Sequence, residues 1–333
     1  MVTNLFGNLL RRPEAGALIG LIGVLVFFVI VGGIEFLYPA SIGSWVSRAA
    51  SLGIIAIPVG LLMIAGELDI SIGATITSGA LITALVSGYF GQPIVVGMVA
   101  ALAFGALVGL LNGYLVLRTG VPSFIVTLGT LFAVSGLLLG ATVVITGTTS
   151  IALQAPQFAK TMFGGFFGPG FQVLVLWWIG ITAAFVFFVH LSRYGNWIFA
   201  IGGDSVSARN AGIPTGRITI LLFVLSSVCA SFVGMSQAIL FQSVQATPQL
   251  TLIFNTIIAV VVGGVLLTGG FGSVIGIFLG TITFAVVTQG IYYTDFDQTW
   301  SNMVIGILLL GAVLMNNTFR QLALSAATRK KGA

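Results

Sequence analysis

The chain of 333 residues is 58% hydrophobic and only 6% charged, whereas a soluble domain carries about 25% charged residues. This composition excludes a soluble globular protein and indicates an all-α polytopic membrane protein. The net charge of +5 does not indicate nucleic-acid binding, because the basic residues lie in short segments and at the chain ends rather than on one face.

Ten apolar runs follow one another along the chain, and a bilayer-spanning helix needs about 20 such residues. The first run, 17–37, is longer than the apolar region of a signal peptide, so we expect an uncleaved span. The expected fold is a transmembrane domain over 17–317 with about ten helices, between tails at 1–16 and 318–333. The nine further runs are 48–66, 71–90, 94–117, 122–146, 171–190, 218–242, 252–268, 271–291 and 299–317.

The 12 basic residues are distributed unequally between the two sides of these spans, since only Arg48 and Lys160 fall opposite the termini. Because basic residues are enriched in cytoplasmic segments, we expect both termini and the segment 192–217 in the cytoplasm. Asp295 and Asp297 then lie on the outer side. The basic residues on the side of the termini are Arg11, Arg12, Arg118, Arg193, Arg209, Arg217, Arg320, Arg329, Lys330 and Lys331.

Two pairs of neighbouring runs are separated only by short interruptions that contain glycine, Gly66–Ile70 and Thr268–Gly270. Such interruptions in comparable places of two halves are typical of broken helices beside a transport path. The second and the seventh span are five places apart in chain order. Because successive spans cross the membrane in opposite directions, two spans an odd number of places apart run antiparallel. Spans 2–5 and 7–10 can therefore form an inverted repeat.

The first interruption holds two carboxylates, Glu67 and Asp69, followed by Ser71. Carboxylates between apolar runs are costly unless they face water, protein or a polar substrate. Two interpretations remain open. The side chains line a translocation path, or Asp69 caps the next helix and contacts no ligand.

Two residues near the start of the run 122–146 are further candidates for the path. Phe124 can stack on the apolar face of a sugar, and Thr127 can donate or accept a hydrogen bond inside a span. Helix packing is the simpler explanation for either residue taken alone.

The segment 192–217 is the longest polar interruption between apolar runs. Asp204 is suited to cap a short helix, Gly212 to end it in a left-handed conformation, and Pro214 prevents its continuation. The resulting helix, 205–211, has about two turns and is too short to be stable alone in water. It must be held by its flanks or by a partner.

Four sequence patterns resemble those of sugar-type ABC importer permeases, the family of the ribose and xylose permeases, and together they cover about residues 45–315. The last pattern departs from the family over 252–256, which lacks the usual Glu-Leu-Asp, so no substrate contact is carried over from those acids. The patterns are R-Y-G-x-x-x-F-A-I-G-G-D-x-x-S-A-R-x-A-G-I from Arg193, G-E-L-D-I-S-I-G from Gly66, N-G at Asn112 with P-S-F-I-V-T-L-G from Pro122, and N-T-I-I-A-V-V-V-G-G from Asn255 with a later G-G-F-G-S.

The resemblance implies a fold like that of type II ABC importers and the role of a permease subunit for a monosaccharide, sugar alcohol or related small polyol. Such a chain has no catalytic residue, metal or cofactor of its own. ATP hydrolysis would belong to a separate ABC ATPase, and the sequence has no G-x-x-x-x-G-K-[ST] phosphate loop. The other implied partners are a periplasmic sugar-binding protein, a second permease copy or paralogue, and the lipid bilayer of the bacterial inner membrane.

The resemblance also assigns two groups of residues. The expected ATPase-coupling residues are Arg193, Gly195, Gly202, Asp204, Val206, Ala208, Arg209, Asn210 and Gly212. The expected translocation-path residues are Glu67, Asp69, Ser71, Asn112, Phe124, Thr127 and Asn255. An ion-coupled secondary transporter with inverted repeats is the alternative; paired intramembrane acids would be needed for it, and only Glu67 and Asp69 are candidates. The sequence does not identify the sugar.

Overall fold

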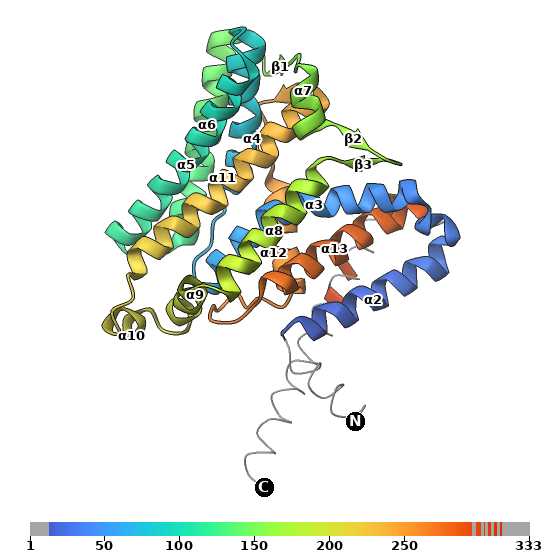
Figure 1. Cartoon of the computed structure of the whole chain (residues 1–333). Helices are drawn as coiled ribbons and strands as arrows, with labels where there is room; N and C mark the ends of the chain where they lie inside the picture. Colours follow the sequence, from blue (N-terminus) through green and yellow to red (C-terminus); the bar gives the residue numbers. More distant parts are fainter. Residues whose placement is uncertain are drawn as a thin grey trace.

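The computed structural model describes residues 13–294, 298–300 and six single positions between 303 and 314. Within these residues, 7 helices are long and apolar enough to cross a membrane. They are α2 (Pro13–Gly32), α3 (Pro39–Ile64), α4 (Ile72–Thr83) with its π-helical continuation η2 (Ala84–Tyr89), α5 (Ile94–Thr119), α6 (Ser123–Thr146), α11 (Thr215–Phe241) and α13 (Val274–Gly290) (Figure 1). The predicted all-α polytopic fold is therefore confirmed.

Two further predicted runs form shorter helices. The run 171–190 becomes α8 (Leu174–His190), which is bent by 75° from the following α9 (Arg193–Gly203). The run 252–268 is helical only in α12 (Leu250–Val262), whose 13 residues span about 20 Å at 1.5 Å per residue and cannot cross a bilayer alone. The tenth run, 299–317, lies largely outside the described residues.

The connections hold the remaining short elements. Two antiparallel pairs, β1 (Ser150–Ala152) with β4 (Ser243–Gln245) and β2 (Phe166–Phe167) with β3 (Phe171–Gln172), are the strands of the described residues. The β1 strand lies at the end of the molecule opposite α10 (Ser205–Asn210) (Figure 1). The short helices are η1 (Ile34–Leu37), α7 (Gln157–Ala159), η3 (Lys160–Gly164), η4 (Ile291–Tyr293) and η5 (Gln298–Trp300).

Two long helices, α3 and α11, form the centre of the bundle. The α3 helix packs on α12 and α13, whereas α11 packs on α4 and α5, and the two central helices also contact each other. Each central helix thus packs against the two helices that follow the other one. This reciprocal packing is what an inverted repeat of the two halves produces.

The matched breaks of the two halves differ from those we predicted. The segment 65–71 follows α3 and leads into α4, and the segment 242–249 follows α11 and leads into α12. The two segments meet where the shorter helices begin: the Gln249 N–H donates to the Gly73 carbonyl (3.2 Å), and Thr77 Oγ1 donates to the Thr247 carbonyl (3.0 Å). The counterpart of Gly66–Ile70 in the second half is therefore 242–249. Thr268–Gly270 does interrupt the helices, between α12 and α13, but it does not occupy the matching place.

Close backbone packing accounts for several of the chain's 45 glycines. Where α4 crosses α11, a Cβ atom on Gly234 would lie 1.8 Å from the Ile76 carbonyl oxygen, and one on Gly79 would lie 2.2 Å from the Ser231 carbonyl oxygen. Small residues at such crossings let backbones approach within a membrane, where the hydrophobic effect does not drive helices together.

Candidate functional site

The segment 192–217 folds as the two short helices α9 and α10. Ser192 caps α9 by accepting from the Tyr194 N–H (3.2 Å). The Arg193 guanidinium lies over the Trp197 ring, 5.2 Å from its centroid, which fixes the start of α9 through a cation–π contact. A Cβ atom on Gly195 would lie 1.8 Å from the Val189 carbonyl oxygen, so the turn between α8 and α9 needs a residue without a side chain.

Asp204 caps α10 as the sequence predicted. Its carboxylate accepts from the Val206 N–H (2.9 Å), the Ser207 N–H (3.2 Å) and the Ser207 hydroxyl (2.6 Å). Donation by Ser207, and then by the Val206 N–H, holds the pKa of the Asp204 carboxyl below its ordinary value. At the other end Gly212 is left-handed, with φ at 84°, and the Ile213 N–H closes the helix onto the Ala208 carbonyl (3.1 Å).

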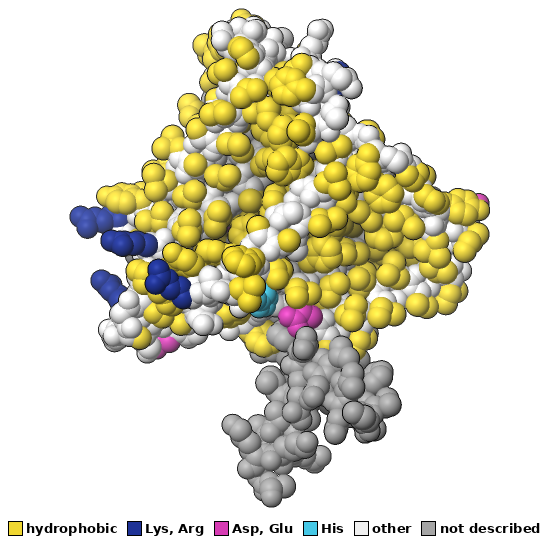
Figure 2. Space-filling model, viewed as in Figure 1, with side chains coloured by type: hydrophobic (Ala, Val, Ile, Leu, Met, Phe, Trp, Pro, Cys, Tyr) yellow, Lys and Arg dark blue, Asp and Glu magenta, His cyan; other side chains and the backbone are white. Residues whose placement is uncertain are grey.

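The side chains of α10 divide into an inner and an outer group. Ala208 is buried and anchors the helix to the bundle. Val206, Arg209 and Asn210 are exposed and share one face by their spacing, and Val206 is 66% exposed although it is apolar. Most of the lysine and arginine side chains visible in Figure 2 gather at the lower left, over α10 and the neighbouring helix ends. This face is suited to dock on a partner.

The end of α9 touches both halves of the bundle, at a place we call the glycine junction (Gly66, Gly202, Gly269 and Gly270). A Cβ atom on Gly202 would lie 1.7 Å from the Ile64 carbonyl oxygen and 2.6 Å from the Gly270 nitrogen. The Gly270 N–H donates to that same Ile64 carbonyl (2.8 Å). The junction therefore joins α9 to the break after α3 and to the turn after α12.

Four predicted path residues come together in a buried network around Asp69, which is 0% exposed. One carboxylate oxygen accepts from the Ser71 N–H (2.9 Å) and the Ser71 hydroxyl (2.6 Å), and the other accepts from the Ser226 hydroxyl of α11 (2.9 Å). The Asn112 amide donates to Ser71 Oγ (2.8 Å) and accepts from Thr130 Oγ1 (2.7 Å). The network thus joins the break to α5, α6 and α11.

Thr127 belongs to the same network, whereas Phe124 does not. The Ile70 N–H donates to Thr127 Oγ1 (3.1 Å), and the Leu68 N–H donates to Ser123 Oγ (3.0 Å), so α6 supports the backbone of the break. Phe124 is exposed on the surface of the described chain, and Glu67 is only partly buried. In this conformation Asp69, Ser71, Asn112 and Thr127 hold the break closed and are shielded from solvent.

Asn255 lies elsewhere, in a cavity of about 370 Å³ with both polar and apolar walls, between α3, α11, α12, α13 and the β2–β3 segment. Its lining includes Arg48, Gln237 and Gln289. A second polar cavity of about 250 Å³ shares Gln237 with the first and extends along 242–249 towards α4. Both cavities lie at the end of the bundle away from α10, because both are lined by the last turns of α11, and the first also by the first half of α3.

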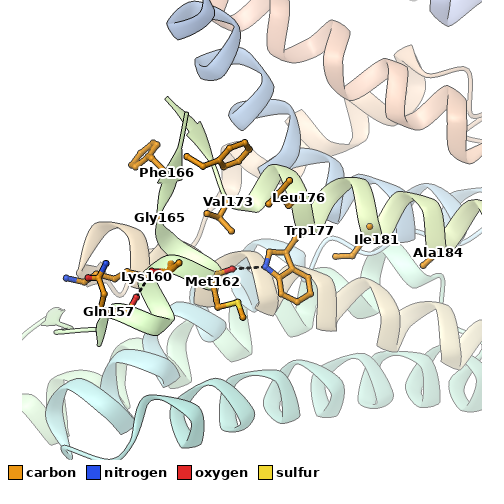
Figure 3. A pocket seen from close by; sticks show the side chains of 13 residues that line it. Gln157, Lys160, Met162, Gly165, Phe166, Val173, Leu176, Trp177, Ile181 and Ala184 are labelled. Atoms are coloured by element: carbon orange, nitrogen blue, oxygen red, sulfur yellow. Dashed lines mark hydrogen bonds between the residues drawn. The ribbon is translucent and has the colours of Figure 1, made fainter. Parts of the chain in front are cut away.

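A larger cavity, of about 820 Å³, is lined mainly by apolar side chains (Figure 3). It follows one face of α8 through Leu176, Trp177 and Ile181, and the Trp177 indole N–H donates to the Met162 carbonyl (2.8 Å). Polar side chains are confined to Gln157, Lys160 and Thr161 at one end. Its lining offers a hydrophilic solute few partners, so size alone does not identify a transport path.

Sequence reasoning missed the polar residues that complete these sites: Ser226, Thr130, Gln237 and Gln289. They lie inside apolar runs, singly or beside one other serine or threonine. The sequence signal for these residues was the free-energy cost of a polar side chain in a transmembrane helix, since an amide there must meet water, protein or a ligand. Arg48 was placed at the outer end of the run 48–66, whereas α3 begins at Pro39 and Arg48 therefore lies inside the helix.

The comparisons with known proteins agree with this architecture. The family model described as the permease component of the branched-chain amino acid transport system matches residues 41–313. The chain belongs to this permease family. The permease is 30% identical to a probable ABC transporter permease protein, y4mJ, of Sinorhizobium fredii, over 88% of this chain and 87% of that one.

Two further relatives have names that state a sugar. The fructose import permease protein FrcC of Rhizobium meliloti is 27% identical, covering 93% of this permease and 87% of the relative. The ribose import permease protein RbsC of Escherichia coli is 28% identical, covering 89% and 92%. The permease is therefore a transport subunit of an ABC importer and not an enzyme, and its family implies an ATPase and a binding protein as partners.

Proposed function

We propose that this permease forms the translocation path for a monosaccharide, sugar alcohol or related small polyol in the bacterial inner membrane. A separate ABC ATPase would drive it, a periplasmic binding protein would deliver the sugar, and a second permease copy or a paralogue would complete the path. Both termini and α10 would face the cytoplasm, where the basic residues around α10 favour that orientation.

The proposal rests on the place of α9 and α10 in the fold, between an exposed face and both halves of the bundle. The outer face of α10 presents Val206, Arg209 and Asn210 to solvent, and α9 ends in the glycine junction. A partner that moves α10 therefore acts on both halves of the bundle together. Rigid-body rocking of the halves then alternates access between the two sides of the membrane.

The test is uptake with and without the partner ATPase. Cells that carry the permease and the binding protein but lack the partner ABC ATPase should take up no labelled D-ribose, D-xylose or D-fructose, and adding the ATPase should restore uptake of at least one. Concentrative uptake by the purified permease alone in liposomes, driven by a proton or sodium gradient, would favour the ion-coupled alternative instead.

A further inference from the structure

We propose that the cavity lined by Arg48, Gln237, Asn255 and Gln289 is a binding subsite for a polyhydroxylated solute within the permease itself. The inference rests on the proposed function and adds to it, because a permease served by a binding protein needs no affinity of its own. Here the chain would contribute to selecting the solute.

Several hydrogen-bonding side chains that line this cavity have no partner among the described residues. Ser44 Oγ donates to Gln289 Oε1 (3.2 Å), and Ser47 Oγ accepts from the Gln172 N–H (2.9 Å). Among the described residues, the side chains of Arg48, Gln237 and Asn255 make no hydrogen bond. A guanidinium offers five donors, and each amide offers two donors and an acceptor. Such a mixture complements neighbouring hydroxyl groups, each of which both donates and accepts.

These polar side chains come from four different helices and line the same cavity. Arg48 comes from α3, Gln237 from α11, Asn255 from α12 and Gln289 from α13. Polar side chains are costly in a transmembrane bundle, and where they face a common cavity they mark a pathway or a binding site. Structural hydrogen bonding does not explain them, because three of the four lack a described partner.

The same cavity also has apolar walls. Phe166, Phe241 and Phe284 line the same cavity. Small-molecule sites combine apolar and aromatic walls with a few polar groups that fix orientation. A saccharide needs both, since its C–H faces pack on aromatic rings while its hydroxyl groups hydrogen-bond. The volume of about 370 Å³ is at the low end for ligand pockets and suits one small solute.

The charges that line the cavity further restrict the class of solute that it can bind. Of the described residues that line the cavity, Arg48 is charged and none is acidic, so the cavity disfavours cations and accepts a neutral sugar or a sugar acid. Gln237 and Phe241 also line the neighbouring cavity beside Thr77 and Gln249. A solute leaving the subsite would therefore pass Gln237 and reach the point where α4 and α12 meet.

The experiment uses the complete complex of permease, ATPase and binding protein in proteoliposomes, with D-ribose, D-xylose, D-fructose and D-gluconate as probes. Gln237→Leu and Asn255→Leu should each lower uptake of the transported probe about tenfold or more per ATP hydrolysed, while ATPase binding and basal ATP hydrolysis stay unchanged. Gln154→Leu is the matched control, because Gln154 is exposed and lies outside both cavities. Arg48→Leu separates the two solute types, since it should reduce D-gluconate uptake more than uptake of a neutral sugar.

A second measurement guards against variants that fold poorly. In a Cys229→Ser background, Gln237→Cys should react with a membrane-impermeant thiosulfonate added from outside, and the transported probe should slow this reaction. Uptake in Gln237→Leu and Asn255→Leu equal to that of Gln154→Leu, or thiol modification unaffected by the probe, would overturn the subsite while leaving the proposed function intact. A wild-type complex that binds no ATPase or transports none of the four probes would instead overturn the proposed function and the subsite with it.

Discussion

The segments 65–71 and 242–249 occupy equivalent places in the two halves but differ in how they treat polar groups. In the first, Asp69 is fully buried and its carboxylate receives three hydrogen bonds from Ser71 and Ser226. In the second, the side chains of Ser243, Gln245 and Gln249 are exposed and line a cavity. One break is closed by protein, and the other is open to solvent.

The difference shows how one architecture can serve two roles. A buried carboxylate is tolerated only when protein donors replace its water, so the Asp69 network makes 65–71 rigid. Polar groups that keep their water can exchange it for a ligand's hydroxyl groups at little cost. The closed break is therefore suited to transmit movement, and the open break to contact the solute.

The largest expected effect comes from breaking the closed side. Asp69→Leu leaves three buried donors without an acceptor, and at about 1–3 kcal/mol for each we expect a loss of about 3–9 kcal/mol of stability. Asp69→Asn keeps one acceptor and should lose less. Asn255→Leu, from the open half, should stay within about 0.5 kcal/mol of wild type. Thermal unfolding in detergent would measure all three, and equal losses in Asp69→Leu and Asn255→Leu would remove the contrast between the two breaks.

The glycine junction tests whether the closed break is connected to α9. Gly202→Ala places a Cβ atom against the Ile64 carbonyl oxygen, which forces the backbones apart and should cost about 1–3 kcal/mol. We expect ATP hydrolysis to continue while solute uptake per ATP falls severalfold. Gly203→Ala is the control, because a Cβ atom on Gly203 would meet nothing within 4 Å. Similar uptake by the two variants would show that the junction transmits nothing.

Gly212 tests the geometry of α10 without a clash, because a Cβ atom there meets nothing within 4 Å. Gly212→Val forces a β-branched residue into the left-handed conformation, which costs about 1–2 kcal/mol. Membrane insertion should be normal, while co-purification of the ATPase and substrate-stimulated ATP hydrolysis should be lost. Gly212→Asn, which tolerates that conformation, should retain both. Normal ATPase co-purification in Gly212→Val would refute the docking role of α10.

The smallest expected effect is that of Arg209→Ala on the exposed face of α10. An exposed charge contributes about 0.2–1 kcal/mol, so the apparent affinity for the ATPase should fall by a factor of about 1.4 to 5. The difference should shrink at high salt, because exposed charges are screened. Binding measured at two ionic strengths would check this. A loss that is independent of salt would mean that Arg209 acts through packing rather than charge.

Local features of the fold were predictable, and features set by tertiary contacts were not. Asp204 and Gly212 were recognised because capping depends on a few adjacent residues. The partners of Asp69 were not, since Ser226 lies 157 positions away. The matched break was missed because glycine was taken as its marker, whereas 242–249 contains no glycine. Gln237 and Gln289 were missed because one or two polar residues scarcely change the hydropathy of an apolar run.

The stretch from Asp204 to Gly212 carries its own cap and its own terminator, and it meets the bundle chiefly through Ala208. It is therefore a self-contained segment that can be replaced as a unit. Grafting the corresponding stretch of a related permease should redirect this chain to that permease's ATPase without redesigning the membrane helices. The neighbouring Gly202 has no such freedom, because its backbone meets segments from both halves. Partner choice can thus diverge rapidly in evolution while the transmission beneath it stays fixed.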